Sequence, residues 1–369
     1  MKRISIAHPV FNGNEKKYLN ECIDTGWVSA NGRFVEEFEK KFAEYCGCKY
    51  AISCSNGTVS LHLILLAMGV GPGDEVIMPT LTYIATANTV RYCGATPVLV
   101  DSEERTFNIN PEKIEEKITN RTKAIMPVHL YGLPSDMEAI MEISKKYDIP
   151  VIEDAAEAHG AEYKGRRVGS FGLAGSFSFF GNKVITSGEG GMIVTNDENL
   201  YKRMKLLKGQ AVSPDKKYWH IDIGYNYRMT NMQAAVGLGQ LENIDWHIAE
   251  RERIAKLYMK HLEGTEKYMK MQYKPNNCKQ TYWMNNVILQ DTVMKEREQV
   301  MKEMEDCNIE MRPVFYPMHV MPPYLDNTIS CPVAEKLGAR GISLPSHAML
   351  SEEDIAYICD CLKKIVMEG

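Results

Sequence analysis

Residues 151–160 read VIEDAAEAHG, and residues 176–191 read SFSFFGNKVITSGEGG. The first stretch ends an apolar run at Asp154, and the second places Lys183 in a turn rich in serine and glycine. Because open α/β sheets bind ligands at the carboxyl ends of their strands, we expect both side chains at a ligand site. Pyridoxal phosphate requires a carboxylate for its ring nitrogen and an amine for its aldehyde. The two stretches therefore predict a site for that coenzyme.

Strand and helix patterns alternate around these stretches, from about residue 34 to residue 200. This alternation predicts an α/β fold with a mostly parallel sheet flanked by helices. Apolar runs predict strands at 50–56, 75–80, 96–101, 123–132, 149–154, 174–180 and 190–197, and a hairpin at 161–172. Helical periodicity predicts helices at 34–47, 57–70, 85–94, 111–118, from Asp136 onward and along 229–262.

The length of 369 residues exceeds that of a typical single domain. We expect a large coenzyme-binding domain over 1–245 and a smaller C-terminal α/β domain over 246–369, with the N-terminal segment able to pack against the smaller one. Residues 208–225 are polar and aromatic without a core pattern. A loop of this length inside a compact domain is usually functional or mobile.

The composition is that of an ordinary globular protein, with 44% hydrophobic residues, 25% charged residues and a net charge of -5. It has no basic excess for nucleic acid or an anionic membrane. We find no apolar core of a secretion signal and no segment of membrane-spanning length. The ten cysteines fit neither a disulfide framework nor a paired zinc motif. We therefore expect reduced thiols, no metal site and a cytoplasmic protein.

A phosphate site is expected where residues 55–60, SNGTVS, place Gly57 and Thr58 between a strand and a helix. Free backbone N–H groups and the helix dipole favour an anion there. Ser178, five residues before Lys183, is a candidate for a second phosphate contact. Taken alone, the Asn-Gly pair is also a common helix cap, and Ser178 an ordinary strand residue.

Lys183 and Asp154 each have a structural interpretation as well. A lysine alone is more often solvated, and an aspartate before a helix is often a cap. Together they fit the coenzyme, because desolvation between an aromatic strand and a glycine-rich turn lowers a lysine pKa and makes the amine nucleophilic.

Three further side chains are candidates around the coenzyme ring. Tyr83 is placed to stack on one face, the small Ala156 to lie against the other, and Glu157 to reach the phenolic oxygen. Tyr83 is alternatively a core residue. Glu153 points to the opposite face of its strand and is interpreted as structural.

Five blocks of sequence follow one another in the order SNGTVSLHL (55–63), PTLTYIATAN (79–88), VIEDAAEAHG (151–160), SFSFFGNKVITSGEGGMIVTND (176–197) and GYNYRMTNMQAA (224–235). In this order they resemble the sugar aminotransferases of the DegT/DnrJ/EryC1/StrS family, a branch of the fold-type I pyridoxal phosphate enzymes. The resemblance covers essentially the whole chain. It implies the fold-type I architecture.

Residue roles follow from the resemblance, position by position. It implies that Lys183 holds the coenzyme as a Schiff base and that Asp154 pairs with the ring nitrogen. Gly57, Thr58 and Ser178 match phosphate-binding positions, and Glu157 matches the neighbour of the phenolic oxygen.

The resemblance also implies a shared active site. Asn226 matches an asparagine that reaches the phosphate from the neighbouring subunit. A homodimer, or a dimer of dimers, is the expected assembly.

The likeness is greatest to family members that act on GDP-4-keto-6-deoxy-D-mannose. The blocks that carry it are GWVSANGRFVEEFE (26–39), PVHLYG (127–132), SFSFFGNK (176–183), YWHIDIGYNYRMTN (218–231), TYWM (281–284) and RPVFYPMH (312–319). It implies that L-glutamate donates an amino group to sugar C4, with Lys183 as general acid and base. A UDP- or dTDP-linked keto sugar and a non-catalytic coenzyme-binding regulator stay open as alternatives. The family's 3-dehydratases are disfavoured, because they carry histidine where this chain has lysine.

Candidates for sugar and nucleotide contacts lie in the same blocks. They are Trp219, His220, Arg312, Tyr316 and His319, with lower weight on Trp27 and Ser29. Arg312 could answer a pyrophosphate charge. Each of these residues could equally be a structural residue at a loop or domain contact.

Overall fold

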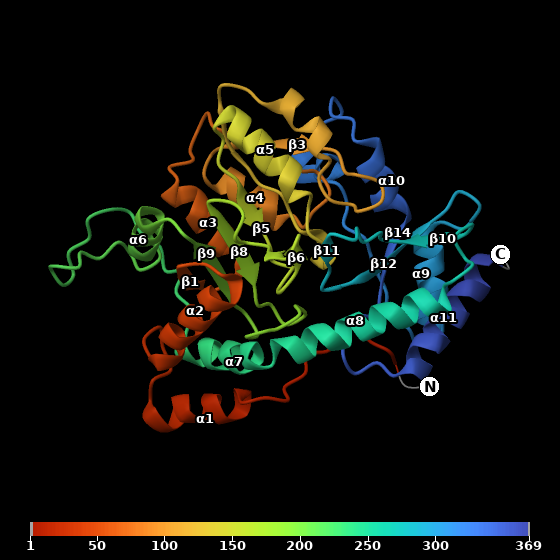
Figure 1. Ribbon diagram of the computed structural model, residues 1–369, viewed down its shortest axis with the longest axis horizontal. Coiled ribbons are helices and arrows are strands. Elements are labelled where there is room, and N and C mark those ends of the chain that lie inside the picture. The colour runs from red at the N-terminus through yellow and green to blue at the C-terminus, as the bar shows by residue number, and fades with distance from the viewer. Residues whose placement is uncertain (1–2, 368–369) are drawn as a thin grey trace.

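The computed structural model describes residues 3–367 (Figure 1). Seven strands form its main sheet, in the order β3-β2-β4-β5-β8-β9-β1. Parallel bridges from Ile125 to Val151 and from Val128 to Asp154 join the β4 side to β5. β9 runs antiparallel to both neighbours, and the other neighbouring pairs are parallel. The strands are β1 (Tyr50–Cys54), β2 (Glu75–Pro79), β3 (Thr96–Val100), β4 (Thr122–Ile125), β5 (Ile152–Asp154), β8 (Ala174–Ser178) and β9 (Gly191–Thr195).

The sheet separates two apolar cores, because successive side chains of a strand point to opposite faces. On β9, Met192 and Val194 enter one core and Ile193 enters the other. α2 and α7 supply the first core, α3, α4 and α6 the second, and α5 covers the β2 and β4 side. The helices of this part are α1 (Glu15–Thr25), α2 (Arg33–Cys46), α3 (Gly57–Ala67), α4 (Ala85–Tyr92), α5 (Met137–Tyr147), α6 (Glu198–Leu207) and α7 (Asn231–Glu242). The predicted mostly parallel α/β layer is confirmed.

A second, antiparallel sheet lies in the C-terminal part, in the order β10-β12-β14-β13. It packs with α8, α9 and α11 around its own apolar core. Its elements are α8 (Ile244–His261), β10 (Met269–Met271), β12 (Asn285–Leu289), α9 (Arg297–Asp306), β13 (Arg312–Pro313), α10 (Pro332–Arg340), β14 (Gly341–Leu344) and α11 (Glu352–Met367). A small sheet of β6 (Glu162–Tyr163), β7 (Arg166–Arg167) and β11 (Cys278–Lys279) connects the two parts and contains the predicted hairpin.

The N-terminal segment packs against the C-terminal part. Ile4 forms a parallel bridge with Ile309, and the Ser346 amide donates to the Ile6 carbonyl at 2.9 Å. The beginning of the described chain and α11 lie on the same side of the molecule in Figure 1. The domain boundary near residue 246 stays a prediction.

Three element predictions were wrong in detail. Residues 111–118 form two 3-10 turns, Pro111–Lys113 and Glu115–Lys117, because a segment this short nucleates a helix poorly and instead follows the packing of Ile114 and Ile118 against the core. The strand predicted at 123–132 ends at Ile125, since Pro127 has no N–H for the ladder. The helix predicted along 229–262 is interrupted at Asn243, whose φ and ψ are -118° and 20°.

Within residues 3–367, every helix is too short or too polar to span a bilayer.

Candidate active site

The carboxyl ends of β5 and β8 bring together the ionisable side chains that the sequence singled out. Asp154 is the last residue of β5, which pairs in parallel with β8, and Lys183 lies in the loop that follows β8. The Lys183 Nζ lies 3.8 Å from the Glu157 Oε1, and its side chain is 11% exposed. An amine and two carboxylates thus share one largely dehydrated edge of the sheet.

Asp154 is buried and held by two donors. The Thr86 hydroxyl donates to its Oδ2 at 2.8 Å, and the Ala156 amide donates to its Oδ1 at 3.2 Å. Burial raises the pKa of the Asp154 carboxyl, although these two hydrogen bonds and the Lys183 charge oppose the rise. Since a buried carboxylate is costly without a cationic partner, the position suits a ligand that brings one.

Glu157 and Lys183 shift each other's ionisation. Burial raises the pKa of Glu157 to about 7, against the opposing effects of the Lys183 charge and of the Tyr131 amide, which donates to Oε2 at 2.8 Å. Burial lowers the pKa of the Lys183 amine, with Glu157 and Asp154 opposing. The amine is thereby moved toward its neutral, nucleophilic form.

Trp283 completes the surroundings of the amine. Its ring centroid lies 3.8 Å from the Lys183 Nζ, and its indole N–H donates to the Asn182 carbonyl at 2.8 Å. The ring stacks on Tyr131 at 6.0 Å and 13°, and Tyr131 in turn stacks on Phe315. An aromatic stack that joins Trp283 and Phe315 of the C-terminal part to Tyr131 of the larger part therefore borders the site.

The N-terminus of α3 abuts the end of β8. The Asn56 side chain caps the helix by accepting the Val59 amide at 2.9 Å. A Cβ on Gly57 would lie 2.7 Å from the Ser178 Cβ, so only glycine lets the helix start approach the strand this closely. The first-turn N–H groups, the Thr58 side chain and the Ser178 hydroxyl form a cradle suited to an anionic group.

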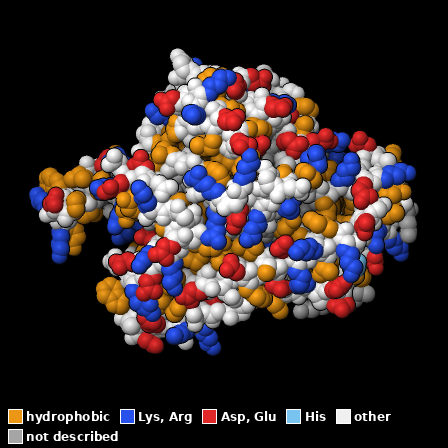
Figure 2. All heavy atoms as spheres, in the orientation of Figure 1, with side chains coloured by type: hydrophobic (Ala, Val, Ile, Leu, Met, Phe, Trp, Pro, Cys, Tyr) orange, Lys and Arg blue, Asp and Glu red, His pale blue; other side chains and the backbone are white. Residues whose placement is uncertain are grey.

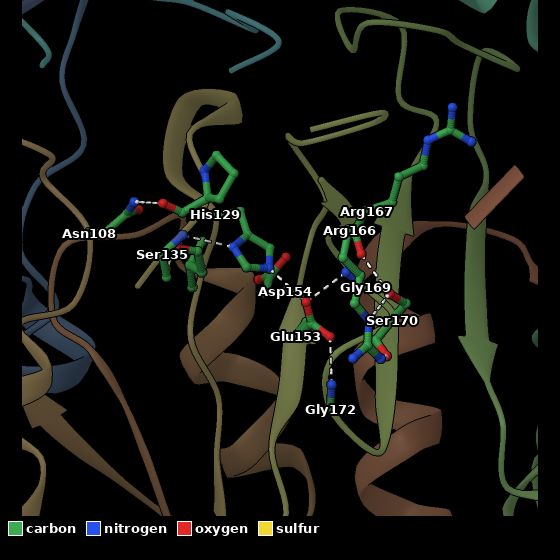
Figure 3. A network of polar contacts seen from close by, with 12 residues as sticks. Asn108, His129, Ser135, Glu153, Asp154, Arg166, Arg167, Gly169, Ser170 and Gly172 are labelled. Carbon is green, nitrogen blue, oxygen red and sulfur yellow. Dashed lines mark hydrogen bonds and ion pairs between the residues drawn. The ribbon is translucent and has the colours of Figure 1, made fainter. Parts of the chain in front are cut away.

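Glu153 has a structural role, as its position in the strand predicted. It is fully buried on the other side of β5, where it accepts the Gly169 and Gly172 amides at 2.6 and 2.8 Å and faces the His129 Nε2 at 3.1 Å (Figure 3). The Ser135 amide donates to the His129 Nδ1, so the Nε2 carries the proton. This network fixes the loops that flank β5 and leaves Asp154 to face the site.

The comparison with families decides the identity of the fold. The model of the DegT/DnrJ/EryC1/StrS aminotransferase family matches residues 10–363. The chain belongs to that family. The resemblance stated from the five sequence blocks is confirmed.

Curated relatives of this DegT/DnrJ/EryC1/StrS aminotransferase match over its full length. It is 52% identical to GDP-perosamine synthase of Caulobacter vibrioides, over 100% of this chain and 99% of that one. It is 50% identical to GDP-perosamine synthase of Escherichia coli, over 99% of both chains. A putative sugar aminotransferase of Streptococcus pneumoniae, solved in its PLP form, superposes with a TM-score of 0.94 at 26% identity and covers 100% of this chain and 99% of that chain.

Tyr83 lies beside the aromatic stack of the aminotransferase, and Ala156 lies beside Asp154. Tyr83 precedes α4, is 57% exposed, and has its ring 5.8 Å from that of Phe315. Ala156 is half-buried two residues after Asp154. Their contacts with a coenzyme ring stay predictions.

Three predicted residues of the aminotransferase belong to the segment between α6 and α7. Residues 211–223, here called the arm, extend away from the body of the molecule (Figure 1). Trp219 is 54% exposed on the arm, and the His220 Nδ1 contacts the Gln210 carbonyl at 2.7 Å. Asn226 is exposed at the base of the arm, where it pairs with Gly209.

The residues predicted from RPVFYPMH differ in their surroundings. Arg312 is half-exposed and lies 3.6 Å from Glu310. Tyr316 is 46% exposed, and its hydroxyl accepts the Arg297 Nη2 at 2.7 Å. His319 is 3% exposed, with Nδ1 at 2.8 Å from the Thr80 hydroxyl and Nε2 at 3.0 Å from Glu335.

Both ring nitrogens of His319 are thus engaged inside the protein, which favours the structural alternative for that residue. Trp27, at 57% exposed, and Ser29, whose carbonyl accepts the Asn231 amide at 2.6 Å, lie in the segment before α2.

Residue-by-residue reasoning did not single out Thr86, Trp283 or Tyr131. Thr86 and Trp283 stand inside the quoted blocks PTLTYIATAN and TYWM, and Tyr131 inside PVHLYG. Their position inside these blocks was the sequence signal that could have identified them. The contacts themselves join residues 26 to 100 positions apart, which no local pattern reveals.

Proposed function

We propose that this aminotransferase transfers the amino group of L-glutamate to C4 of GDP-4-keto-6-deoxy-D-mannose, giving GDP-perosamine and 2-oxoglutarate. The observation that carries the proposal is the Lys183 amine, held beside Glu157 at the same sheet edge as Asp154. The full-length identity to two GDP-perosamine synthases supports the choice of sugar.

The residues present fit pyridoxal phosphate. The cradle of Gly57, Thr58 and Ser178 suits its phosphate, because glycine at 57 leaves open the space that a Cβ would fill. Asp154 is a buried carboxylate without a cationic partner within 4 Å among residues 3–367, and it suits a protonated ring nitrogen. When bound, the coenzyme supplies an aldehyde that holds the amino group and a ring that takes up electron density.

The protein's own groups hold and move protons. Lys183 acts as a free amine that takes a proton from the α-carbon of glutamate at Nζ and returns one to sugar C4 in the second half-reaction. Its lowered pKa keeps a fraction of the amine neutral for this task. Asp154 stays charged next to a bound cation, and Glu157, with a pKa of about 7, either accepts or donates a hydrogen bond as pH varies.

We infer that the active form is a homodimer or a dimer of dimers in which Asn226 reaches the partner subunit's site. The exposed apolar side chains of the arm support this assembly (Figure 2). Tyr218 is 92% exposed and Ile223 80% exposed. A monomer rarely leaves such a protrusion uncovered.

Product analysis tests the proposed function. The purified protein, loaded with pyridoxal phosphate, is incubated with L-glutamate and with GDP-, UDP- or dTDP-linked 4-keto-6-deoxy sugars, and products are resolved by mass and NMR. We expect a 4-amino sugar and equimolar 2-oxoglutarate from the GDP-linked substrate, and neither from Lys183→Ala. A 3-deoxygenated sugar as main product, or turnover confined to the UDP or dTDP sugar, would refute the assignment. No 2-oxoglutarate from any sugar would support a non-catalytic regulator instead.

A further inference from the structure

Arg251, on α8, is a buried cation next to the lysine loop. It is 6% exposed and, among residues 3–367, forms no ion pair with a carboxylate. Its guanidinium donates instead to three backbone carbonyls: from Nη1 to Trp283 at 2.8 Å and to Ser346 at 2.6 Å, and from Nη2 to Lys183 at 3.3 Å. One side chain therefore joins the lysine loop to two segments of the C-terminal part.

Trp283 adds a second connection at the neighbouring carbonyl. Its indole N–H donates to the Asn182 carbonyl at 2.8 Å, while its ring lies 3.8 Å from the Lys183 Nζ. Arg251 holds the backbone of Trp283 through the Trp283 carbonyl. Trp283 thus holds the Asn182 carbonyl, and Arg251 holds both the Lys183 carbonyl and the backbone of Trp283, whose ring the amine faces.

The charge of Arg251 is not neutralised by its surroundings. Burial lowers its pKa to about 10, so it remains protonated at neutral pH. Burial, followed by the charges of Lys183 and Arg251, lowers the pKa of His159 to about 3. Burial, followed by the charge of Arg251, lowers the pKa of His247 to about 4. Burial, followed by the charges of His8 and Arg251, lowers the pKa of His347 to about 4. These imidazoles are therefore neutral.

The amine of Lys183 faces groups from several elements. Glu157 and Asp154, from the end of β5, favour its protonated form, and Arg251, from α8, opposes it. The neutral His159 and the ring of Trp283 add no net charge. Without the guanidinium charge, burial alone would oppose the effect of the two carboxylates on the Lys183 pKa.

A purely structural anchor would not need this charge. An unpaired charge in the interior is costly, and well-packed apolar residues often replace buried ions without loss of stability. The three carbonyl bonds compensate part of that cost, and one of them ends on Lys183 itself.

We propose that Arg251 is a positioning residue for Lys183: it holds the 182–183 backbone against Trp283 and sets the charge that the amine experiences. The inference rests on the proposed function, because it takes Lys183 as the amine that binds the coenzyme and moves protons. Its first test needs neither coenzyme nor substrate, so a failure of the proposed function is seen separately, in the wild-type product assay.

The first measurement is the pH dependence of Lys183 acylation in the coenzyme-free protein. Acetic anhydride labels the amines, and mass spectrometry of the Lys183 peptide gives the extent of labelling at each pH. The midpoint is the pH at which labelling of Lys183 is half-maximal. We expect Arg251→Gln to raise the midpoint by about half a pH unit or more, since a nearby like charge is removed. Arg251→Lys keeps the charge and should leave the midpoint near that of the wild type.

The second measurement is the rate of covalent attachment of pyridoxal phosphate to Lys183, trapped with borohydride. Both Arg251→Lys and Arg251→Gln lose the carbonyl clamp, and we expect each to slow attachment by roughly tenfold. In a Lys183→Ala background, adding Arg251→Gln should change the noncovalent affinity for pyridoxal phosphate by less than about twofold, because Arg251 acts through Lys183.

Arg340 provides the matched control. Its guanidinium also donates to several carbonyls, those of Leu289, Gln290, Val293 and Lys295, and it makes no contact with the lysine loop. Arg340→Gln should leave the Lys183 midpoint and attachment rate unchanged.

Two results would overturn the proposal. One is an unaltered midpoint and attachment rate in folded Arg251→Gln. The other is an equal loss of coenzyme affinity with and without Lys183. If Arg251→Gln does not fold, the rate of pyridoxal phosphate attachment in Arg251→Lys is the deciding measurement. A rate equal to that of the wild type would then refute the proposal that Arg251 holds the lysine loop.

Discussion

At the residue scale, burial sets the ionisation of the groups at the sheet edge. Asp154, Glu157 and Lys183 each have their charged form disfavoured by desolvation. The Lys183 charge opposes that effect in both carboxylates and they oppose it in Lys183, whereas the Asp154 charge adds to the rise in the Glu157 pKa. The site of the coenzyme-free protein is therefore held at a cost in stability. A ligand that brings a cation to Asp154 and removes the amine charge of Lys183 lowers this cost in stability.

Glu157→Gln should reveal that cost. The pKa of Glu157 is raised from its usual 4.5 to about 7, so between these values the unfolded chain loses a proton that the folded chain keeps. Stability contributed by the neutral acid falls as pH rises through this window and stays lost above pH 7. Glutamine retains an oxygen for the Tyr131 amide and has no ionisation cost.

We expect the coenzyme-free Glu157→Gln variant to be more stable than the wild type by about 1–3 kcal/mol at pH 8, with the difference vanishing toward pH 4.5. Denaturant titration at several pH values measures it. A variant less stable than the wild type at pH 8 would show that attraction to Lys183 outweighs burial.

Asp154→Asn removes the carboxylate and keeps an oxygen for the Thr86 hydroxyl. We expect a folded protein whose turnover falls by about 10²–10³, the loss typical when one preorganised electrostatic partner is removed. Steady-state rates and a far-UV CD melt measure the two effects. Near-normal turnover would remove Asp154 from its assigned role.

At the element scale, the site depends on how closely α3 approaches β8. The strand after α2 and the helix after Asn56 were predictable from local patterns, since an apolar run and an Asn-Gly cap specify them. The turns at 111–118 were not, because a helical pattern too short to nucleate follows its tertiary contacts.

Gly57→Ala should push this helix start off the strand. The new Cβ would meet the Ser178 Cβ at 2.7 Å, and we expect a loss of about 1–3 kcal/mol in unfolding free energy. Coenzyme affinity should fall by about tenfold, equivalent to one hydrogen bond to a charged group. Gly71→Ala, with open space around its Cβ, is the control and should be neutral.

Coenzyme titration by absorbance, together with urea unfolding, measures both variants. If the coenzyme affinity of Gly57→Ala were unaltered, the start of α3 would not be part of the phosphate site.

At the scale of the whole molecule, the arm is the feature that a single chain does not explain. The arm extends from the body of the molecule (Figure 1). Its Tyr218, Trp219 and Ile223 side chains are exposed, and Asn226 pairs with Gly209 at its base. A second copy of the chain, with the same arm, is the partner that the proposed shared site requires.

Ile223→Asp combined with Tyr218→Asp should weaken that assembly, because two charges replace apolar contacts. We expect sedimentation to show a shift to monomer at micromolar concentration and activity to fall with it. Met294→Asp, at a residue 83% exposed outside the arm, is the control and should remain assembled. An arm variant that stays dimeric with full activity would contradict the proposed interface.

The sequence by itself determined the alternating elements, the position of Asp154 at a strand end, the lysine in its glycine-rich turn and the family. These follow from local periodicity, caps and motif order, which depend on neighbouring residues only. The tertiary structure decided that Thr86 supports Asp154, that Trp283 faces the amine and that Arg251 holds its backbone. Such contacts join residues 68 to 100 positions apart, and the pKa shifts follow from burial, so both arise only when the chain packs.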